Sequence, residues 1–250
     1  MARRQVLLLS SSNVHGFSYL EYAANDIKEF LKKHNVQEVL FIPYALKDHD
    51  LYLKKVKDVF TSWGLQMTGI HESKNPVESV KSAKSVFVGG GNTFLLLKSL
   101  YDNKLVDLIR SRVMNEGMLY IGTSAGTNVS TKSIHTTNDM PIVYPPSFDA
   151  LNLVPFNINP HYVDPEPDSK HKGETREERI MQYLETDHAK VVLGLREGST
   201  LLIDGDKAVL KGLKNARIFV KGAEPQEVEV GTDLSYLLKD EENSSESCPK

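Results

Sequence analysis

Cysteine is almost absent from this chain, with Cys248 the single one among 250 residues. One cysteine excludes an intramolecular disulfide and any zinc or iron–sulfur site built from several thiolates. We therefore expect a protein of the reducing cytoplasm. Metal-ligand spacing is also missing, because the sequence has no H-E-x-x-H pattern. Neither a metal nor another cofactor is expected.

Long apolar runs and an excess of one charge are lacking as well. The basic start, residues 1–4, is followed by only four apolar residues, 6–9. A signal peptide needs about 7–15 apolar residues and a membrane span about 20. Lys and Arg number 30 against 33 Asp and Glu, a net charge of −3. We predict a soluble monomer or homodimer, and partners that include neither nucleic acid nor membrane.

The first half of the chain alternates short apolar runs with stretches of helical spacing. Strands are expected at 6–9, 38–43, 65–70, 85–88 and 118–122, and helices at 20–31, 51–63, 77–83 and 93–116, the last broken near Asn103. Strands that alternate with helices form βαβ units. The pattern predicts an α/β fold with a mostly parallel sheet flanked by helices.

The second half is less regular. Residues 131–168 are rich in Pro, Asn and Asp and are expected to form functional loops. Capping-box spacing between Thr175 and Glu178 predicts a helix to about residue 185. Short runs over 191–230 predict antiparallel hairpins at the edge of the sheet. We expect one α/β domain over residues 1–238 and a disordered, acidic and Ser-rich tail over 239–250.

The sharpest local motif is Gly122-Thr123-Ser124-Ala125-Gly126, which has the form G-x-S-x-G. It stands after a predicted strand and before a predicted helix, as in a nucleophile elbow. The turn exposes the serine and brings backbone segments so close that only glycine fits easily beside it. The pattern favours Ser124 as a nucleophile over a purely structural glycine turn.

A second glycine run, Gly89-Gly90-Gly91, also ends a strand and opens a helix. Phe94 stands where a dinucleotide fingerprint needs glycine, and no P-loop ending occurs in the chain. Glycines at the carboxyl end of a parallel strand lie near the crevice where such sheets bind ligands. The run could donate an N–H to an oxyanion beside Ser124, or form a tight turn before a capped helix.

A serine nucleophile needs a base, and the base needs an orienting group. His161 follows a short apolar run and a proline, whereas His135 and His171 lie in polar loops and stay open as alternatives. Asp139 and Glu197 are candidate orienting carboxylates. The structural alternatives are an Asx-type turn for Asp139 and a solvated loop charge for Glu197.

Arg176 stands at the start of the predicted helix, directly after Thr175. A cation at this end is unfavourable, because the helix dipole prefers anions there. Its guanidinium either pairs with Glu174 or Glu177 or is kept for an anionic ligand. The sequence leaves both interpretations open.

Five motifs in one consistent order resemble the peptidase E family, serine exopeptidases that act as α-aspartyl dipeptidases. They are Gly89-Gly-Gly-Asn-Thr-Phe94, Tyr120-Ile-Gly-Thr-Ser124-Ala-Gly126, Thr136-Thr-Asn-Asp-Met-Pro-Ile-Val143, Ile158-Asn-Pro-His161 and His171-Lys-Gly-Glu-Thr-Arg-Glu177. The likeness extends over residues 6–230. The chain departs from bacterial members at Thr123 and Thr127, where those usually have Trp and Ala.

The resemblance implies a fold like class I glutamine amidotransferases, with serine in place of their cysteine nucleophile. It also implies hydrolysis of dipeptides with an N-terminal aspartate by a catalytic domain over residues 1–238. By motif match the nucleophile is Ser124, the base His161 and the orienting carboxylate Asp139, with Glu197 as the alternative third member. Arg176 matches the arginine that binds the aspartate side chain of the substrate.

We hypothesise that hydrolysis passes through an acyl-enzyme, with N–H groups of Gly90 and Ala125 holding the oxyanion. One alternative is a related serine peptidase that acts on other acidic or β-aspartyl bonds. A second is a non-catalytic module that keeps the elbow as a ligand site. The presence of all three catalytic residue types ranks the second alternative lowest.

Overall fold

The main sheet has seven strands in the order β3-β2-β4-β5-β1-β8-β9. A computed structural model describes residues 3–166, 170, 172–186 and 190–239. The parallel strands are β1 (Gln5–Leu9), β2 (Glu38–Ile42), β3 (Gln66–Gly69), β4 (Ser85–Val88) and β5 (Leu119–Thr123). The antiparallel strands β8 (Ser199–Asp204) and β9 (Lys207–Gly212) extend the sheet beyond β1. The predicted α/β fold with a mostly parallel sheet and C-terminal antiparallel strands is confirmed.

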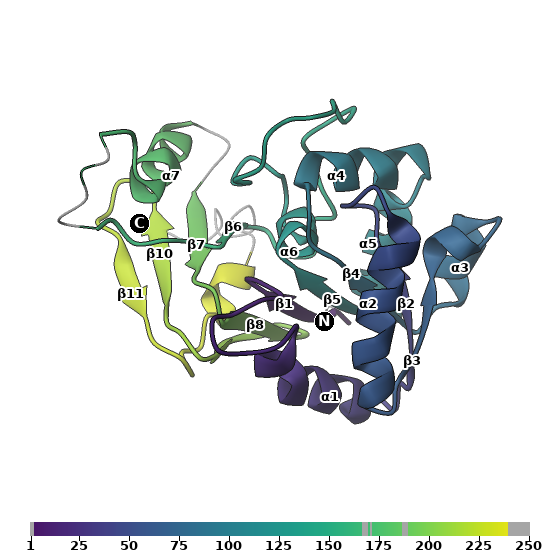
Figure 1. The fold of residues 1–250 in the computed structure, drawn as a ribbon. Coiled ribbons are helices and arrows are strands. Elements are labelled where there is room, and N and C mark those ends of the chain that lie inside the picture. Colours follow the sequence, from purple (N-terminus) through teal and green to yellow (C-terminus); the bar gives the residue numbers. More distant parts are fainter. Residues whose placement is uncertain (1–2, 167–169, 171, 187–189, 240–250) are drawn as a thin grey trace, which may run out of the picture.

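Helices cover both faces of this sheet, because successive side chains of a strand point to opposite sides. In β1, Val6 and Leu8 belong to one hydrophobic core, and Leu7 and Leu9 belong to the other. The first core includes residues of α4 and α5, and the second includes residues of α1 and α2 (Figure 1). The helices are η1 (Glu21–Ala23), α1 (Ala24–Lys33), α2 (His49–Ser62), η2 (Ile70–Glu72), α3 (Pro76–Ser82), α4 (Thr93–Asp102), α5 (Val106–Glu116), α6 (Ala125–Ser130), α7 (Arg176–Glu185) and η3 (Ser235–Leu238).

A second sheet was not expected. Strands β6 (Asn157–Pro160), β7 (Val191–Leu195), β10 (Ala216–Val220) and β11 (Gln226–Val228) form it in the order β11-β10-β7-β6. Helix α7 packs on it through a cluster of Tyr162, Ile180, Leu184, Val192 and Phe219. Of the hairpins predicted at the edge of the main sheet, β8–β9 lies there, whereas β10–β11 belongs to the second sheet. Residues 131–168, predicted as loops, contain β6.

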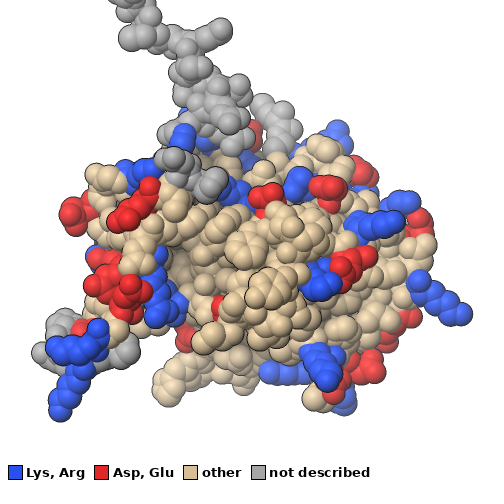
Figure 2. Space-filling view, turned by 90° about the horizontal axis from the view of Figure 1, so that it is seen from above, with Lys and Arg blue, Asp and Glu red and all other residues tan. Residues whose placement is uncertain are grey.

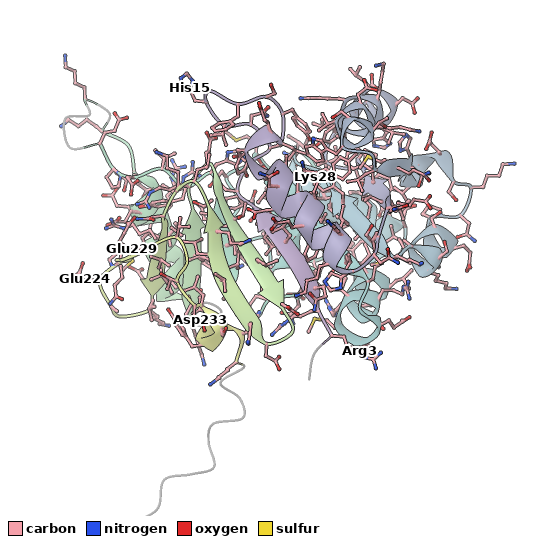
Figure 3. The ribbon with its side chains drawn as sticks, turned by 90° about the horizontal axis from the view of Figure 1, so that it is seen from below. Arg3, His15, Lys28, Glu224, Glu229 and Asp233 are labelled. Atoms are coloured by element: carbon pink, nitrogen blue, oxygen red, sulfur yellow. The ribbon has the colours of Figure 1, made fainter. Side chains whose placement is uncertain are left out.

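Charges of both signs are spread over the surface. On the face seen in Figure 2, Lys, Arg, Asp and Glu lie mostly around the rim, and the centre consists largely of other residues. The opposite face carries Lys28 on α1 and Glu224, Glu229 and Asp233 beside the C-terminal strands (Figure 3). None of the helices in the described ranges has the length and apolar character of a membrane span. The expected tail, apart from Lys239, and Cys248 within it lie outside the described residues.

Candidate active site

The elbow motif forms a strained turn between β5 and α6. Ser124 has φ 54° and ψ −111°, in the positive-φ region that residues with a Cβ rarely adopt. The surrounding structure holds this conformation, since the N–H of Ser124 donates to the carbonyl of Leu9 at 3.1 Å. Strain of this kind is typical of functional sites. The turn presents the serine hydroxyl beyond the end of the sheet.

Both glycines of the motif are required by close backbone contacts. A Cβ on Gly126 would lie 2.1 Å from the carbonyl oxygen of Val88, and one on Gly122 would lie 2.6 Å from that of Gly126. The hydroxyl of Thr127 donates to the carbonyls of Leu9 and Gly122 at 2.6 and 3.0 Å. Thr127 therefore fastens the elbow to the end of β1.

Thr123, the other departure from bacterial members, is fully buried. Its hydroxyl has no hydrogen-bond partner among the residues that the structure describes. A buried side chain does not line an open pocket, so the substitution changes the interior beneath the serine rather than the surface around it.

His161 lies against the serine. Its Nε2 is 3.0 Å from Oγ of Ser124. The residue follows β6 and has φ 53°, and its N–H donates to Oγ of Ser10 at 2.9 Å. The Ser10 hydroxyl in turn donates to the carbonyl of Leu195 at 2.7 Å. Sequence reasoning missed Ser10, whose position directly after a buried strand was the available signal.

Glu197 is the carboxylate that contacts this histidine, with Oε1 at 2.7 Å from Nδ1 of His161. The contact follows from strand pairing, because β6 and β7 are parallel neighbours in which Pro160 is opposite Leu195. Residues just beyond the carboxyl ends of both strands are thereby brought together. Ser124, His161 and Glu197 form one continuous chain of hydrogen bonds.

Asp139 has a different place from the one that the motif match implied. Its Oδ2 accepts from the backbone N–H of Thr93 at 2.7 Å and from the hydroxyl of Thr137 at 3.2 Å. A carboxylate at the first turn of α4 satisfies a free N–H and suits the helix dipole. Asp139 therefore accepts the first N–H of α4, whose N-cap is Asn92, and is not the carboxylate that contacts His161.

The neighbours of Asp139 attach the same loop to β6. The hydroxyl of Thr136 donates to the carbonyl of Ile158 at 2.7 Å, and the amide of Asn138 donates to that of Pro160 at 2.8 Å. The motif at 136–143 thus ties the strand that ends at His161 to the start of α4.

Gly90 is packed directly against Ser124. A Cβ at this position would be 2.9 Å from Cβ and 3.4 Å from Oγ of Ser124. The N–H of Gly90 also interacts with the buried hydroxyl of Tyr52, whose pKa is raised mainly by burial. Ala125 is the first residue of α6, so its N–H has no partner inside the helix. Both residues expected to supply oxyanion donors therefore adjoin Ser124, and the N–H of Gly90 must exchange Tyr52 for the oxyanion in order to act as one.

Arg176 is the first residue of α7, after the Thr175 cap that the capping box predicted. The two glutamates that could have neutralised it have other partners, since Glu174 pairs with Arg179 and Glu177 with Arg217. Among the described residues, none forms an ion pair or hydrogen bond with its side chain. Burial, and then the charge of Arg179, lower the pKa of Arg176. A half-buried cation with no counter-charge among the described residues is suited to an anionic ligand.

Of the two remaining histidine candidates, the structure describes only His135, and its contacts lie outside this hydrogen-bond chain. His135 bonds to Oγ of Ser133 at 2.8 Å and stacks on Tyr183. His171 lies outside the described residues. Within the described part of the chain, no group of three or more His, Cys, Asp or Glu residues is arranged to hold a metal ion.

Comparison with known proteins identifies the family. The model of Peptidase family S51 matches residues 6–211. The chain belongs to this family. A "Probable alpha-aspartyl dipeptidase" of Drosophila melanogaster is 52% identical over 236 residues, which cover 94% of this chain and 98% of that protein. A "Peptidase E" of Streptomyces coelicolor is 50% identical over 233 residues, covering 93% and 94%. The predicted resemblance to the peptidase E family is confirmed.

A solved structure agrees with the fold of this S51 peptidase. The crystal structure of a peptidase from an acI-B1 Actinobacterium has a TM-score of 0.70 and 19% identity, covering 93% of this chain and 97% of that one. At this identity the likeness concerns the fold alone.

Proposed function

We propose that this S51 peptidase is a serine dipeptidase that hydrolyses dipeptides with an N-terminal aspartate. The observation that supports it best is the chain of hydrogen bonds from Ser124 through His161 to Glu197, at 3.0 and 2.7 Å. Nucleophile, base and orienting carboxylate in this order can activate a serine hydroxyl near neutral pH. The names of the Drosophila and Streptomyces relatives point to the same activity.

In the proposed reaction, Nε2 of His161 accepts the proton of the Ser124 hydroxyl as Oγ attacks the carbonyl carbon of the aspartyl residue. The N–H groups of Ala125 and Gly90 hold the negative oxygen of the tetrahedral intermediate. Losing one such donor typically costs about 10²–10³ in rate. His161 then gives its proton to the leaving amine, and an acyl-enzyme remains. Water then attacks the ester carbonyl as His161 accepts its proton, and the bond to Oγ breaks as His161 returns that proton to Ser124, which releases aspartate.

Selectivity for aspartate is assigned to Arg176. A guanidinium can bind a carboxylate through two parallel hydrogen bonds, which a lysine cannot reproduce. Glu174 and Glu177 do not occupy the guanidinium, so it is available for the β-carboxylate of the substrate. Glu177 also accepts from the hydroxyl of Tyr162 at 3.4 Å. That contact ties the start of α7 to the residue after His161.

A direct test compares hydrolysis of Asp-Leu, Asn-Leu and Ala-Leu by the purified protein, with the Ser124→Ala variant as control. We expect cleavage of Asp-Leu alone, and no cleavage by Ser124→Ala. Ser130→Ala is the matched control, because its hydroxyl is buried and, among the described residues, donates to the carbonyl of Thr127 alone. Equal cleavage of all three dipeptides, or full activity of Ser124→Ala, would contradict the proposal.

The same panel decides between the bonds that such a site could cleave. Adding a β-linked aspartyl-leucine separates α-aspartyl hydrolysis from cleavage of β-aspartyl bonds. A serine-directed fluorophosphonate should label Ser124 and no other serine. Failure of this labelling would support a ligand-binding module.

We also propose a cytoplasmic location, on the grounds of the single cysteine.

A further inference from the structure

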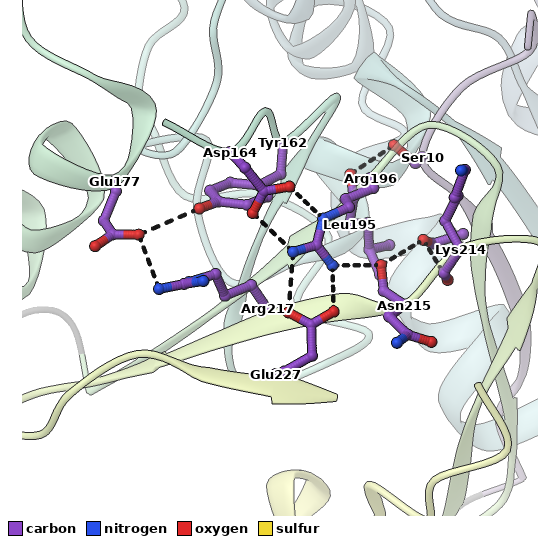
Figure 4. Close-up of polar contacts among 11 residues, drawn as sticks. Ser10, Tyr162, Asp164, Glu177, Leu195, Arg196, Lys214, Asn215, Arg217 and Glu227 are labelled. Carbon is purple, nitrogen blue, oxygen red and sulfur yellow. Dashed lines mark hydrogen bonds and ion pairs between the residues drawn. The ribbon is translucent and has the colours of Figure 1, made fainter. Parts of the chain in front are cut away.

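A network of charged side chains involves residues next to Glu197 and close to His161 in the sequence, and Figure 4 shows its polar contacts. At its centre is Arg196, the residue between the end of β7 and Glu197. Its guanidinium makes five hydrogen bonds, to both carboxylate oxygens of Asp164, both of Glu227 and the carbonyl of Asn215, at 2.7–3.0 Å. A guanidinium has five N–H donors, so every donor of Arg196 is used.

Arg196 and Asp164 join the two chain segments that carry the catalytic pair. Asp164 lies three residues after His161, and Arg196 lies one residue before Glu197. The segments therefore meet twice, once through His161 and Glu197 and once through Arg196 and Asp164. The backbone N–H of Tyr162, which donates to the carbonyl of Leu195 at 3.0 Å, joins them between these points.

Among the described residues, the side chain of Glu197 has no hydrogen-bond partner other than His161. The Glu197 side chain is 53% exposed, whereas that of Arg196 is only 18% exposed. The next residue, Gly198, has φ 93° and no side chain to anchor the turn. An exposed carboxylate on such a turn must lose conformational freedom to stay on an imidazole. Anchoring the preceding residue reduces that cost.

We propose that Arg196 is a positioning residue, which holds Glu197 against His161 by fixing the backbone on both sides of the pair. Arg196 acts through Glu197 and contacts neither Ser124 nor His161 in the described contacts. The inference rests on the proposed roles of Ser124, His161 and Glu197. A positioning role for Arg196 differs from general stabilisation of the fold. Replacement of Arg196 should lower kcat only while Glu197 can still act on His161.

The test is a double-mutant cycle between Arg196→Met and Glu197→Gln, with kcat and KM measured on Asp-Leu. A misplaced catalytic group typically costs up to about 10² in rate, and we expect Arg196→Met to lower kcat by about 10–100-fold. KM should stay within about threefold of the wild-type value, because Arg196 is not expected to contact the substrate. In the Glu197→Gln background, adding Arg196→Met should lower kcat by less than about a further twofold, as expected for residues that act together.

Matched variants separate positioning from stability. Arg112 on α5 has the same exposed fraction, 18%, and bonds to Glu116 and the carbonyl of Ala83. Arg112→Met should lower the melting temperature and leave kcat unchanged. Asp164→Asn, a milder change that spares Arg196, should lower kcat more than Glu227→Gln, because only Asp164 belongs to the segment of His161.

Several results would overturn the inference. These are a kcat of Arg196→Met equal to that of Arg112→Met, equal effects of Asp164→Asn and Glu227→Gln, or losses that multiply fully in the double variant. The rate of fluorophosphonate labelling at Ser124 provides a readout without substrate and should fall in parallel with kcat. Activity that persists in Ser124→Ala would instead contradict the proposed function. That outcome is distinguishable from a failure of the positioning role of Arg196.

Discussion

Glu197 Oε1 lies 2.7 Å from Nδ1 of His161, although 36 positions separate the two residues in the sequence. A carboxylate at Nδ1 favours the tautomer with its proton on that nitrogen. Nε2 is then an acceptor, and it faces the Ser124 hydroxyl at 3.0 Å. The geometry thus supplies the orientation and favours the tautomer that the proposed general base requires.

Replacement of the two candidate carboxylates should have unequal effects. We expect Glu197→Gln to lower kcat on Asp-Leu by about 10²–10⁴, since loss of the orienting carboxylate leaves the wrong tautomer. Asp139→Asn should keep kcat within about tenfold, because an amide oxygen can still accept from the N–H of Thr93 at the start of α4. Steady-state kinetics on both variants check this. A larger loss in Asp139→Asn would reverse the assignment.

Much of the fold could be predicted because its signals are local. Residues 85–88 and 118–122 are apolar runs between helical stretches, and they became β4 and β5 with shifts of no more than one residue. The break near Asn103 separates α4 from α5. The elbow was recognisable because the glycines at 122 and 126 are needed by contacts within one turn and the adjoining strand.

The parts of the fold and site that the sequence did not predict depend on contacts between distant segments of the chain. The sequence of β6, Asn157-Ile-Asn-Pro160, is short and half polar, yet all four residues are buried. The amides of Asn157 and Asn159 find hydrogen-bond partners in the 133–138 loop. The choice between Asp139 and Glu197 required the pairing of β6 with β7, which local pattern does not encode. For the same reason, the short strands after residue 190 could not be assigned to a sheet.

Arg176 should determine the preference for an acidic substrate. Hydrogen bonds to charged groups contribute about 1.5–3 kcal/mol, so Arg176→Gln should lower kcat/KM on Asp-Leu by roughly 10–100-fold. Arg176→Lys should restore only part of the loss, because an ammonium does not offer two parallel N–H donors. Arg179→Gln is the control, since Arg179 is an exposed neighbour on the same helix that pairs with Glu174. Unchanged selectivity for Asp-Leu over Asn-Leu in Arg176→Gln would exclude this role.

The Arg196–Asp164 pair should make stability depend on pH in acid. Hydrogen bonds from Arg196 hold the pKa of Asp164 below its usual value. A carboxyl whose folded pKa is depressed contributes stability that is complete above its unfolded pKa of about 3.9. That contribution is lost as the pH falls through the lower folded pKa. Melting temperatures of wild type and Asp164→Asn should therefore differ at pH 6 and converge near the acid limit. A difference that stays constant with pH would contradict the linkage.

Gly126→Ala should unfold the elbow or displace it. The added Cβ would be 2.1 Å from the carbonyl oxygen of Val88, at the end of the strand that leads to Gly90. Neither backbone can move without disturbing the contact of Gly90 with Ser124. Overpacking typically costs about 1–3 kcal/mol, and a clash between backbones belongs at the upper end of that range. Urea unfolding measures this loss, and kcat of the folded fraction should fall with it.

The matched control for this substitution is Gly222→Ala. Gly222 has φ 77° in the turn after β10, and a Cβ there would meet nothing within 4 Å. The cost is then that of the left-handed backbone alone, about 1–2 kcal/mol, with kcat unchanged. If Gly126→Ala were as stable as Gly222→Ala and fully active, the close contact between α6 and β4 would not be what fixes the nucleophile. The strained φ of Ser124 would then have to be held mainly by its N–H bond to Leu9.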